Sequence, residues 1–297
     1  MRRYPLQNLS NLREEAGVTD GRQTGGCFTA LILAAARGQE NEISPSHGGG
    51  HKCLVPLHGV SMLAWVIDAL RKCPEVGRLL VSFDDPEVLR NDTIISPLLE
   101  DGTLSIIASA ASPARSVMAA AQLDDDFPLL VTTADSPLLT PEMVGEFCRS
   151  ARQSNADIVV AVATESTIRR EFPNSHRTYL RFREARYSGC NLFALVRPTA
   201  VRAAEFWCGV EANRKRPWRL AAAFGIGSLL LFFLRQLTLK DAMLRASKRL
   251  DVTAHAVVLP YPAAALDVDK PSDLALAADV LRTRTPPTIA GMRPGRP

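Results

Sequence analysis

The hydrophobic positions between residues 28 and 163 form short continuous runs that alternate with amphipathic stretches. Four runs predict buried strands: FTALILAA (28–35), RLLVSF (78–83), FPLLVTT (127–133) and ADIVVAVA (156–163). Apolar spacing predicts helices over 61–72, 116–123 and 141–153, and Ser61 and Thr140 are suited to cap the first and the last. Strands that are apolar on both faces and alternate with helices predict an α/β fold with a parallel sheet covered on both sides.

The pattern changes after residue 163. TYLRFREARYSGCNLFALV (178–196) alternates and contains a turn, which predicts antiparallel strands. Residues 201–250 have a helical and basic pattern, VTAHAVVLPYP (252–262) returns to strand character, and 271–281 predicts a closing helix. We therefore expect a flexible leader over 1–27, one domain over 28–282 with a basic helical insertion at about 201–250, and a disordered tail over 283–297.

Composition and charge narrow the class of protein. The 297 residues are 46% hydrophobic and 22% charged, which is ordinary for a globular chain. A net charge of +4 does not by itself indicate nucleic-acid binding, so no nucleic-acid partner is expected. The six cysteines include no C-x-x-C pair, which argues against structural zinc and favours free thiols in a reducing cytoplasm.

The longest apolar run, LAAAFGIGSLLLFFL (220–234), lies within the basic insertion. It has 15 residues, whereas a bilayer-spanning helix needs about 20. Two interpretations stay open. The run packs into the domain or an interface, or residues 214–235 make peripheral contact with a membrane surface.

A loop rich in small residues follows the first predicted strand. In α/β sheets, ligands lie beyond the carboxyl ends of strands, and small residues let backbone amides approach phosphates. The candidates for such a role are Ala34, Ala35, Ala36, Arg37, Gly38 and Lys52. The spacing matches neither common glycine-rich phosphate loop, so a simple strand-to-helix turn is the alternative.

Acidic residues follow two later segments. Asp135 comes directly after the strand 127–133 and precedes Pro137, a pattern that also suits a turn. Asp267 and Asp269 are two residues apart, so they would share one face if the segment were a strand. A capped junction between a strand and a helix is the alternative for this second pair.

Taken in order, LILAAARG…HKCLVPLHGVSML, ADSP and LDVDKPSDL resemble the signatures of the MobA-like nucleotidyltransferases. The resemblance implies a GT-A-type fold, with three α/β/α layers around a mostly parallel, Rossmann-like mixed sheet. It also implies that 34–38 wrap the phosphates of an NTP, that Lys52 contacts them, and that Asp135 binds Mg²⁺ with Asp267 or Asp269, of which we favour Asp267. Ala36 and Glu40 depart from the family pattern.

The same resemblance implies a second substrate. Family members contact the base or ribose near the position of Ser116, and an acceptor phosphate near YSGCNLF. The residues expected to bind that acceptor are Arg177, Arg181, Asn191 and Arg216. The resulting hypothesis is a cytoplasmic, Mg²⁺-dependent enzyme that moves NMP from an NTP to molybdopterin or a sugar or polyol phosphate and releases pyrophosphate. A non-catalytic nucleotide-binding protein and a nucleotide-sugar glycosyltransferase are the alternatives.

Overall fold

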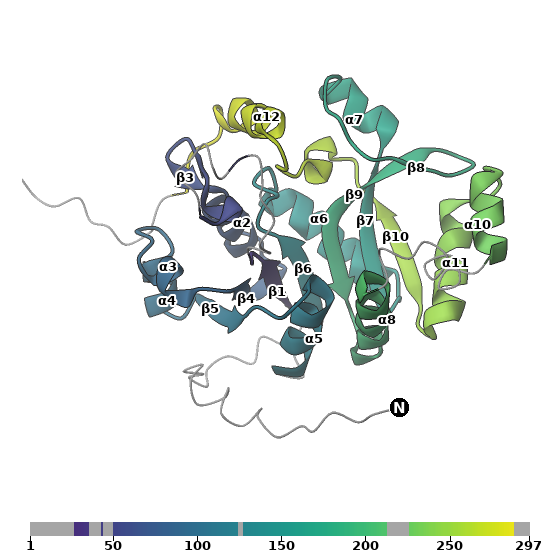
Figure 1. Cartoon of the computed structure of the whole chain (residues 1–297), viewed down its shortest axis with the longest axis horizontal. Coiled ribbons are helices and arrows are strands. Elements are labelled where there is room, and N and C mark those ends of the chain that lie inside the picture. Colours follow the sequence, from purple (N-terminus) through teal and green to yellow (C-terminus); the bar gives the residue numbers. More distant parts are fainter. Residues whose placement is uncertain (1–26, 36–42, 44–49, 124–126, 213–225, 288–297) are drawn as a thin grey trace, which may run out of the picture.

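The computed structural model describes residues 27–35, 43, 50–123, 127–212 and 226–287 (Figure 1). An eight-stranded sheet crosses the molecule in the order β10-β7-β9-β6-β1-β4-β5, with β8 paired to β9. The strands are β1 (Phe28–Leu33), β4 (Val76–Phe83), β5 (Leu104–Ala108), β6 (Leu129–Thr133), β7 (Ile158–Thr164), β8 (Leu180–Arg181), β9 (Arg186–Leu195) and β10 (Ala254–Val258). A separate hairpin joins β2 (Pro56–Leu57) and β3 (Val60–Ser61).

The sheet is mostly parallel, as the apolar runs predict. Strand β1 pairs in parallel with both β4 and β6, β4 with β5, and β10 with β7. Strand β9 lies between β6 and β7 and is antiparallel to both. The antiparallel character expected of 178–196 is therefore confirmed, and β9 joins two parallel groups into one mixed sheet.

Helices cover both faces of this sheet. They are α2 (Met62–Arg71), α3 (Pro86–Arg90), α4 (Ser96–Glu100), α5 (Pro113–Leu123), α6 (Pro141–Gln153), α7 (Glu165–Glu171), α8 (Val201–Ala212), α10 (Ile226–Phe233), α11 (Leu239–Leu250) and α12 (Pro271–Leu281), with short 3-10 turns η2 (Lys52–Leu54), η3 (Pro198–Ala200) and η4 (Pro262–Ala265). Adjacent residues of β1 face opposite ways: Ile32 packs in the larger core with α2 and α6, and Leu31 packs with α5 and α8. This alternation makes three α/β/α layers, as expected.

Local signals in the sequence placed several helix ends correctly. The Ser61 hydroxyl accepts the Ala64 N–H (3.2 Å), and the Thr140 hydroxyl accepts the Met143 N–H (3.3 Å). Each cap satisfies one backbone donor that the first turn leaves unpaired. The helix predicted over 116–123 begins at Pro113 instead, because proline suits the first helical turn.

The remaining predictions on organisation concern segments that the structure describes only in part. The leader over 1–27 and the tail over 283–297 lie mostly outside the described residues. Within the basic insertion, α8, α10 and α11 are helical as expected, and residues 213–225 are outside the description. Across the described part of the chain, no helix has both the length and the apolar character needed to span a membrane.

Candidate active site

The site begins where β1 and β6 end side by side. Just after β6, the Ala134 N–H donates to the Leu33 carbonyl of β1 (3.0 Å), and just after β1, the Ala34 N–H donates to the Ser82 carbonyl of β4 (3.0 Å). The parallel ladder therefore continues one residue beyond each of these two strands. Asp135 follows immediately, so its position relative to Ala34 is set by the backbone of the sheet. Ala34 and Ala35 lie at this carboxyl edge, where α/β proteins bind ligands.

Lys52 reaches the same edge from η2. Its Nζ lies 2.7 Å from Asp135 Oδ2 and 2.7 Å from Asp269 Oδ1, so one ammonium group bridges two carboxylates. Burial acts to lower the pKa of Lys52, but the two carboxylates, Asp135 foremost, outweigh it and raise that pKa above its ordinary value. The side chain therefore stays cationic at neutral pH.

Cys53 holds in place the short turn η2 that carries Lys52. Its thiol donates to the Ala34 carbonyl across 3.4 Å, which ties η2 to the end of β1. Burial raises the pKa of the Cys53 thiol to about 12, so it is neutral at physiological pH and serves packing rather than nucleophilic chemistry.

Asp135 has one carboxylate oxygen free for a ligand. Its backbone carbonyl accepts the Val268 N–H (2.8 Å), which joins the loop after β6 to the segment that carries Asp267 and Asp269. Oδ2 contacts Lys52, whereas Oδ1 is buried and has no hydrogen-bond partner. Burying a carboxylate oxygen without a hydrogen-bond partner costs free energy, unless a ligand binds to that oxygen.

Asp267 faces a different set of partners. The Arg177 guanidinium donates to Asp267 Oδ1 and, over 2.7 Å, to its backbone carbonyl, and the Asn191 amide donates to Oδ2 (3.2 Å). Burial raises the pKa of Asp267, the Arg177 charge opposes that rise, and the carboxylates of Asp269 and Asp135 add to it. The three acids are therefore close enough to repel one another.

The expectation that Asp267 and Asp269 share one strand face is wrong. Residues 266–269 follow η4 without strand structure. Asp267 turns inward to Arg177 and Asn191, while Asp269 lies nearer solvent, with 62% of its side chain exposed, and contacts Lys52. The local chain lacks the period-2 geometry of a strand, so the two carboxylates separate.

The donor set fits a divalent cation whose other ligands come from substrate and water. Within the described residues, no group of three or more His, Cys, Asp or Glu side chains is arranged to hold a metal. Mg²⁺ commonly takes only one or two protein carboxylates and keeps phosphate oxygens and waters. Asp135, with its free buried oxygen, and Asp267 or Asp269 meet that requirement.

The other predicted site residues lie in different places. Ser116 is buried in α5, and its hydroxyl accepts the Ala110 N–H (3.0 Å), which orders the loop before that helix. Arg181 is exposed on β8, and its backbone lies opposite Arg186 of β9 in the antiparallel ladder. The predictions for Ala36, Arg37, Gly38 and Arg216 fall outside the described residues.

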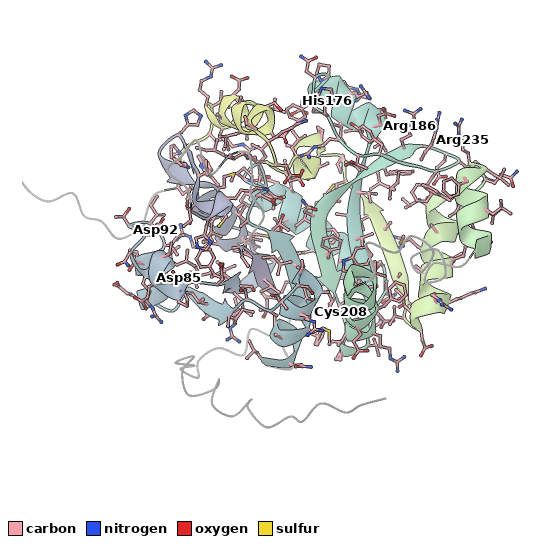
Figure 2. The ribbon with its side chains drawn as sticks, in the orientation of Figure 1. Asp85, Asp92, His176, Arg186, Cys208 and Arg235 are labelled. Atoms are coloured by element: carbon pink, nitrogen blue, oxygen red, sulfur yellow. The ribbon has the colours of Figure 1, made fainter. Side chains whose placement is uncertain are left out.

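Two features of this edge were not predicted from the sequence. Asp84 directly follows β4, and its Oδ1 lies 3.4 Å from Nδ1 of His51, the neighbour of Lys52. An acid placed directly after a buried strand is the signal that could have indicated Asp84. A cavity of about 260 Å³ also opens near Arg177, and it is lined by residues 171–176 together with Ser272, Asp273 and Leu276. Figure 2 shows His176 in this region, beyond the end of α7.

Comparisons with known proteins identify the family and the fold of the chain. The profile of a family described as MobA-like NTP transferase domain matches residues 30–265. Among curated proteins, no sequence matches the chain. A hypothetical transferase from Thermus thermophilus is 29% identical, with a TM-score of 0.70 over 84% of this chain and 99% of that one.

Two more distant structures share the fold. The 4-diphosphocytidyl-2C-methyl-D-erythritol synthase from Anaerococcus prevotii is 14% identical, with a TM-score of 0.54 over 86% of this chain and 97% of its own. CMP:2-keto-3-deoxy-manno-octonic acid synthetase, complexed with CTP, is also 14% identical, with a TM-score of 0.54 over 86% of this chain and 98% of its own. The family match supports nucleotidyl transfer as the general chemistry.

Proposed function

Because the chain belongs to the MobA-like NTP transferase family, we propose that it is a Mg²⁺-dependent nucleotidyltransferase that joins NMP from an NTP to a phosphorylated small molecule. An oxygen of the acceptor phosphate attacks the α-phosphorus of the NTP, and the bond to pyrophosphate breaks. The observation that carries this proposal is the meeting of Lys52, Asp135 and Asp269 at the carboxyl edge of the sheet.

In this proposal, Lys52 binds the negative triphosphate. The lysine is already held between two carboxylates and stays protonated, so it presents a fixed positive charge at the edge where Ala34 and Ala35 follow β1. A preorganised cation stabilises the charge that develops on the phosphate oxygens of the transition state. Bound Mg²⁺ would supply further neutralisation of that charge.

Asp135 and Asp267 have different roles. The free Oδ1 of Asp135 is the oxygen best placed to bind the cation, because it is buried and lacks a partner. Arg177 and Asn191 hold Asp267 in one orientation and lie on the segments expected to face the acceptor. We assign Arg177 and Asn191 to positioning on the acceptor side, where accurate placement supplies much of the acceleration.

The proposal is tested by pyrophosphate release. Each of ATP, CTP, GTP and UTP is combined with molybdopterin or with sugar or polyol phosphates, with Mg²⁺ and with a chelator in its place. CTP is of particular interest, since it is the nucleotide in the complex of the synthetase above. We expect release to require one NTP, one acceptor class and Mg²⁺. NTP binding without release for any acceptor would favour the non-catalytic alternative.

Asp135→Asn tests the metal assignment. The change removes charge at nearly constant volume, and we expect kcat to fall about 10²–10³-fold, the loss of ~3–4 kcal/mol of transition-state stabilisation. Asp279→Asn is the matched control, because Asp279 is 72% exposed and pairs with Arg282 at the surface. Full, Mg²⁺-dependent activity in the Asp135→Asn protein would exclude Asp135 as a metal ligand.

A further inference from the structure

Arginines and exposed apolar side chains lie together where β8 meets the end of α10, and of the arginines Arg181 and Arg235 are exposed and Arg186 is half-buried. We call this surface the basic-apolar edge. It consists of Leu180, Arg181, Arg186, Phe233, Leu234 and Arg235. Figure 1 shows β8 beside α10, and Figure 2 shows Arg186 and Arg235 near each other at this side of the molecule.

Helix α10 buries only part of its apolar surface. Leu231 and Phe232 pack against a small cluster around Phe182, whose ring centroid lies 5.7 Å from that of Phe232. The next two residues stay largely outside that cluster: Phe233 is 77% exposed and touches only the edge of it through Phe232, and Leu234 is 57% exposed. Large apolar groups gathered at one exposed place usually mark an interaction site.

The charges on the same edge are only partly compensated. Arg181 lies opposite Arg186 in the β8–β9 ladder. The positive charges of Arg186 and Arg235 repel that of Arg181 and lower its pKa. Glu165 neutralises Arg186 over 3.2 Å. Neither Arg181 nor Arg235 forms an ion pair with any residue that the structure describes, so a negatively charged partner would relieve their repulsion.

The combination of charge and apolarity selects the partner. A two-fold contact between copies of the chain would bring two patches of the same positive charge together, which is unfavourable. A soluble anion would leave Phe233 and Leu234 exposed. An anionic bilayer suits the arginines and the apolar side chains together. Its headgroup phosphates attract the arginines, and the apolar side chains enter the boundary between the headgroups and the acyl chains.

We propose that the basic-apolar edge docks the protein on the surface of an anionic lipid bilayer. The chain runs from Arg177, which holds Asp267, into β8 and so into the docking surface. Docking would therefore keep Arg177, on the acceptor side of the candidate active site, close to the bilayer.

The test is co-sedimentation of the full chain with vesicles of phosphatidylglycerol and phosphatidylcholine, and with vesicles of phosphatidylcholine alone. We expect binding to the anionic vesicles only, lost at high salt because salt screens the attraction. Arg181→Gln/Arg235→Gln should lower the partition coefficient about 30-fold, since each nearby arginine contributes a factor of roughly 5. Phe233→Ser/Leu234→Ser should lower it about 10-fold or more.

Matched controls remove similar groups elsewhere. Arg90→Gln/Arg282→Gln takes the same charge from two exposed positions on α3 and beyond α12, and Trp207→Ser removes an apolar side chain that is 50% exposed on α8. Circular dichroism and thermal melting verify folding. If the Phe233→Ser/Leu234→Ser protein does not fold, the arginine pair decides the result, because both of its side chains are exposed.

Four results would overturn the proposal. The first is wild-type protein that stays in the supernatant with anionic vesicles at low salt. The second is equal loss of binding in the control and edge variants. The third is a dimer, seen by analytical ultracentrifugation, that Phe233→Ser/Leu234→Ser dissociates without changing vesicle binding. The fourth is tighter binding to a DNA oligonucleotide than to the vesicles. All four measure binding alone, so they are independent of whether nucleotidyl transfer occurs.

Discussion

Asp157 joins three segments that are far apart in sequence. Its Oδ2 accepts the N–H of Thr253 (2.7 Å) and the hydroxyl of the same residue (2.6 Å), and its Oδ1 accepts the Thr199 hydroxyl (2.7 Å). These bonds connect the start of β7 with the start of β10 and with η3. Asp157→Asn keeps the shape of the side chain but removes its charge and replaces one acceptor oxygen with a donor, so it tests the charged form of this junction with little change in packing.

The pKa of Asp157 sets the magnitude of the effect. Burial alone would raise that pKa, but the hydroxyls of Thr199 and Thr253 and the Thr253 amide outweigh burial and lower it from 3.8 to about 2. At 1.36 kcal/mol per pKa unit, the charged form contributes about 2 kcal/mol to the free energy of unfolding at neutral pH. The carboxylate is only 13% exposed, so solvent screens little of this amount.

The sign of the pH dependence follows from the direction of the shift. The pKa of the folded state is lower than that of the unfolded state, so the stabilisation is complete above pH ~4–5 and disappears as the pH falls through about 2. Urea unfolding of the wild-type and Asp157→Asn proteins should therefore differ by about 2 kcal/mol at pH 7 and progressively less between pH ~4 and ~2.

Thermal melting gives an independent measure, because a loss of about 2 kcal/mol should lower Tm by roughly 3–4 °C in a chain of this size. Asp279→Asn, at an exposed carboxylate, should leave both quantities nearly unchanged. Equal stability of wild type and Asp157→Asn at pH 7, or a difference that stays constant down to acid pH, would refute the assignment of a stabilising charge to Asp157.

Two further changes address the active site. Lys52→Ala should weaken NTP binding about 10–100-fold, since it removes a charge-assisted contact to phosphate. Lys72→Ala, which breaks the ion pair of an exposed lysine with Asp68, should leave NTP binding unchanged. Equal NTP titrations for the two variants would place Lys52 away from the phosphates. Asn191 has a positive φ of 49°, so Asn191→Ala should cost about 1 kcal/mol in stability and Asn191→Gly should avoid that strain. Both should reduce turnover about 10-fold, because each removes the amide that orients Asp267, and unchanged turnover in the glycine variant would remove Asn191 from that role.

Short-range patterns were sufficient for the order of elements. The buried runs predicted β1, β4, β6 and β7, and the capping residues located α2 and α6, because helix caps and strand burial depend on neighbours within a few residues. The less hydrophobic strand β5 and the short helices α3, α4 and α7 were not predicted, since their apolar periodicity is too brief to stand out.

By itself, the sequence determined the strand-helix alternation, the helix caps and the order of the acidic and basic residues that resemble the family signatures. Only the tertiary structure decided that β9 enters antiparallel between β6 and β7. It also decided that Lys52 bridges Asp135 and Asp269, which lie 83 and 217 positions away, and that Asp267 forms an ion pair with Arg177 instead. The physical reason is the range of the forces concerned. Local backbone hydrogen bonding selects helix or strand, whereas the pairing of distant charges depends on which apolar faces pack together and bring those residues to one edge of the sheet.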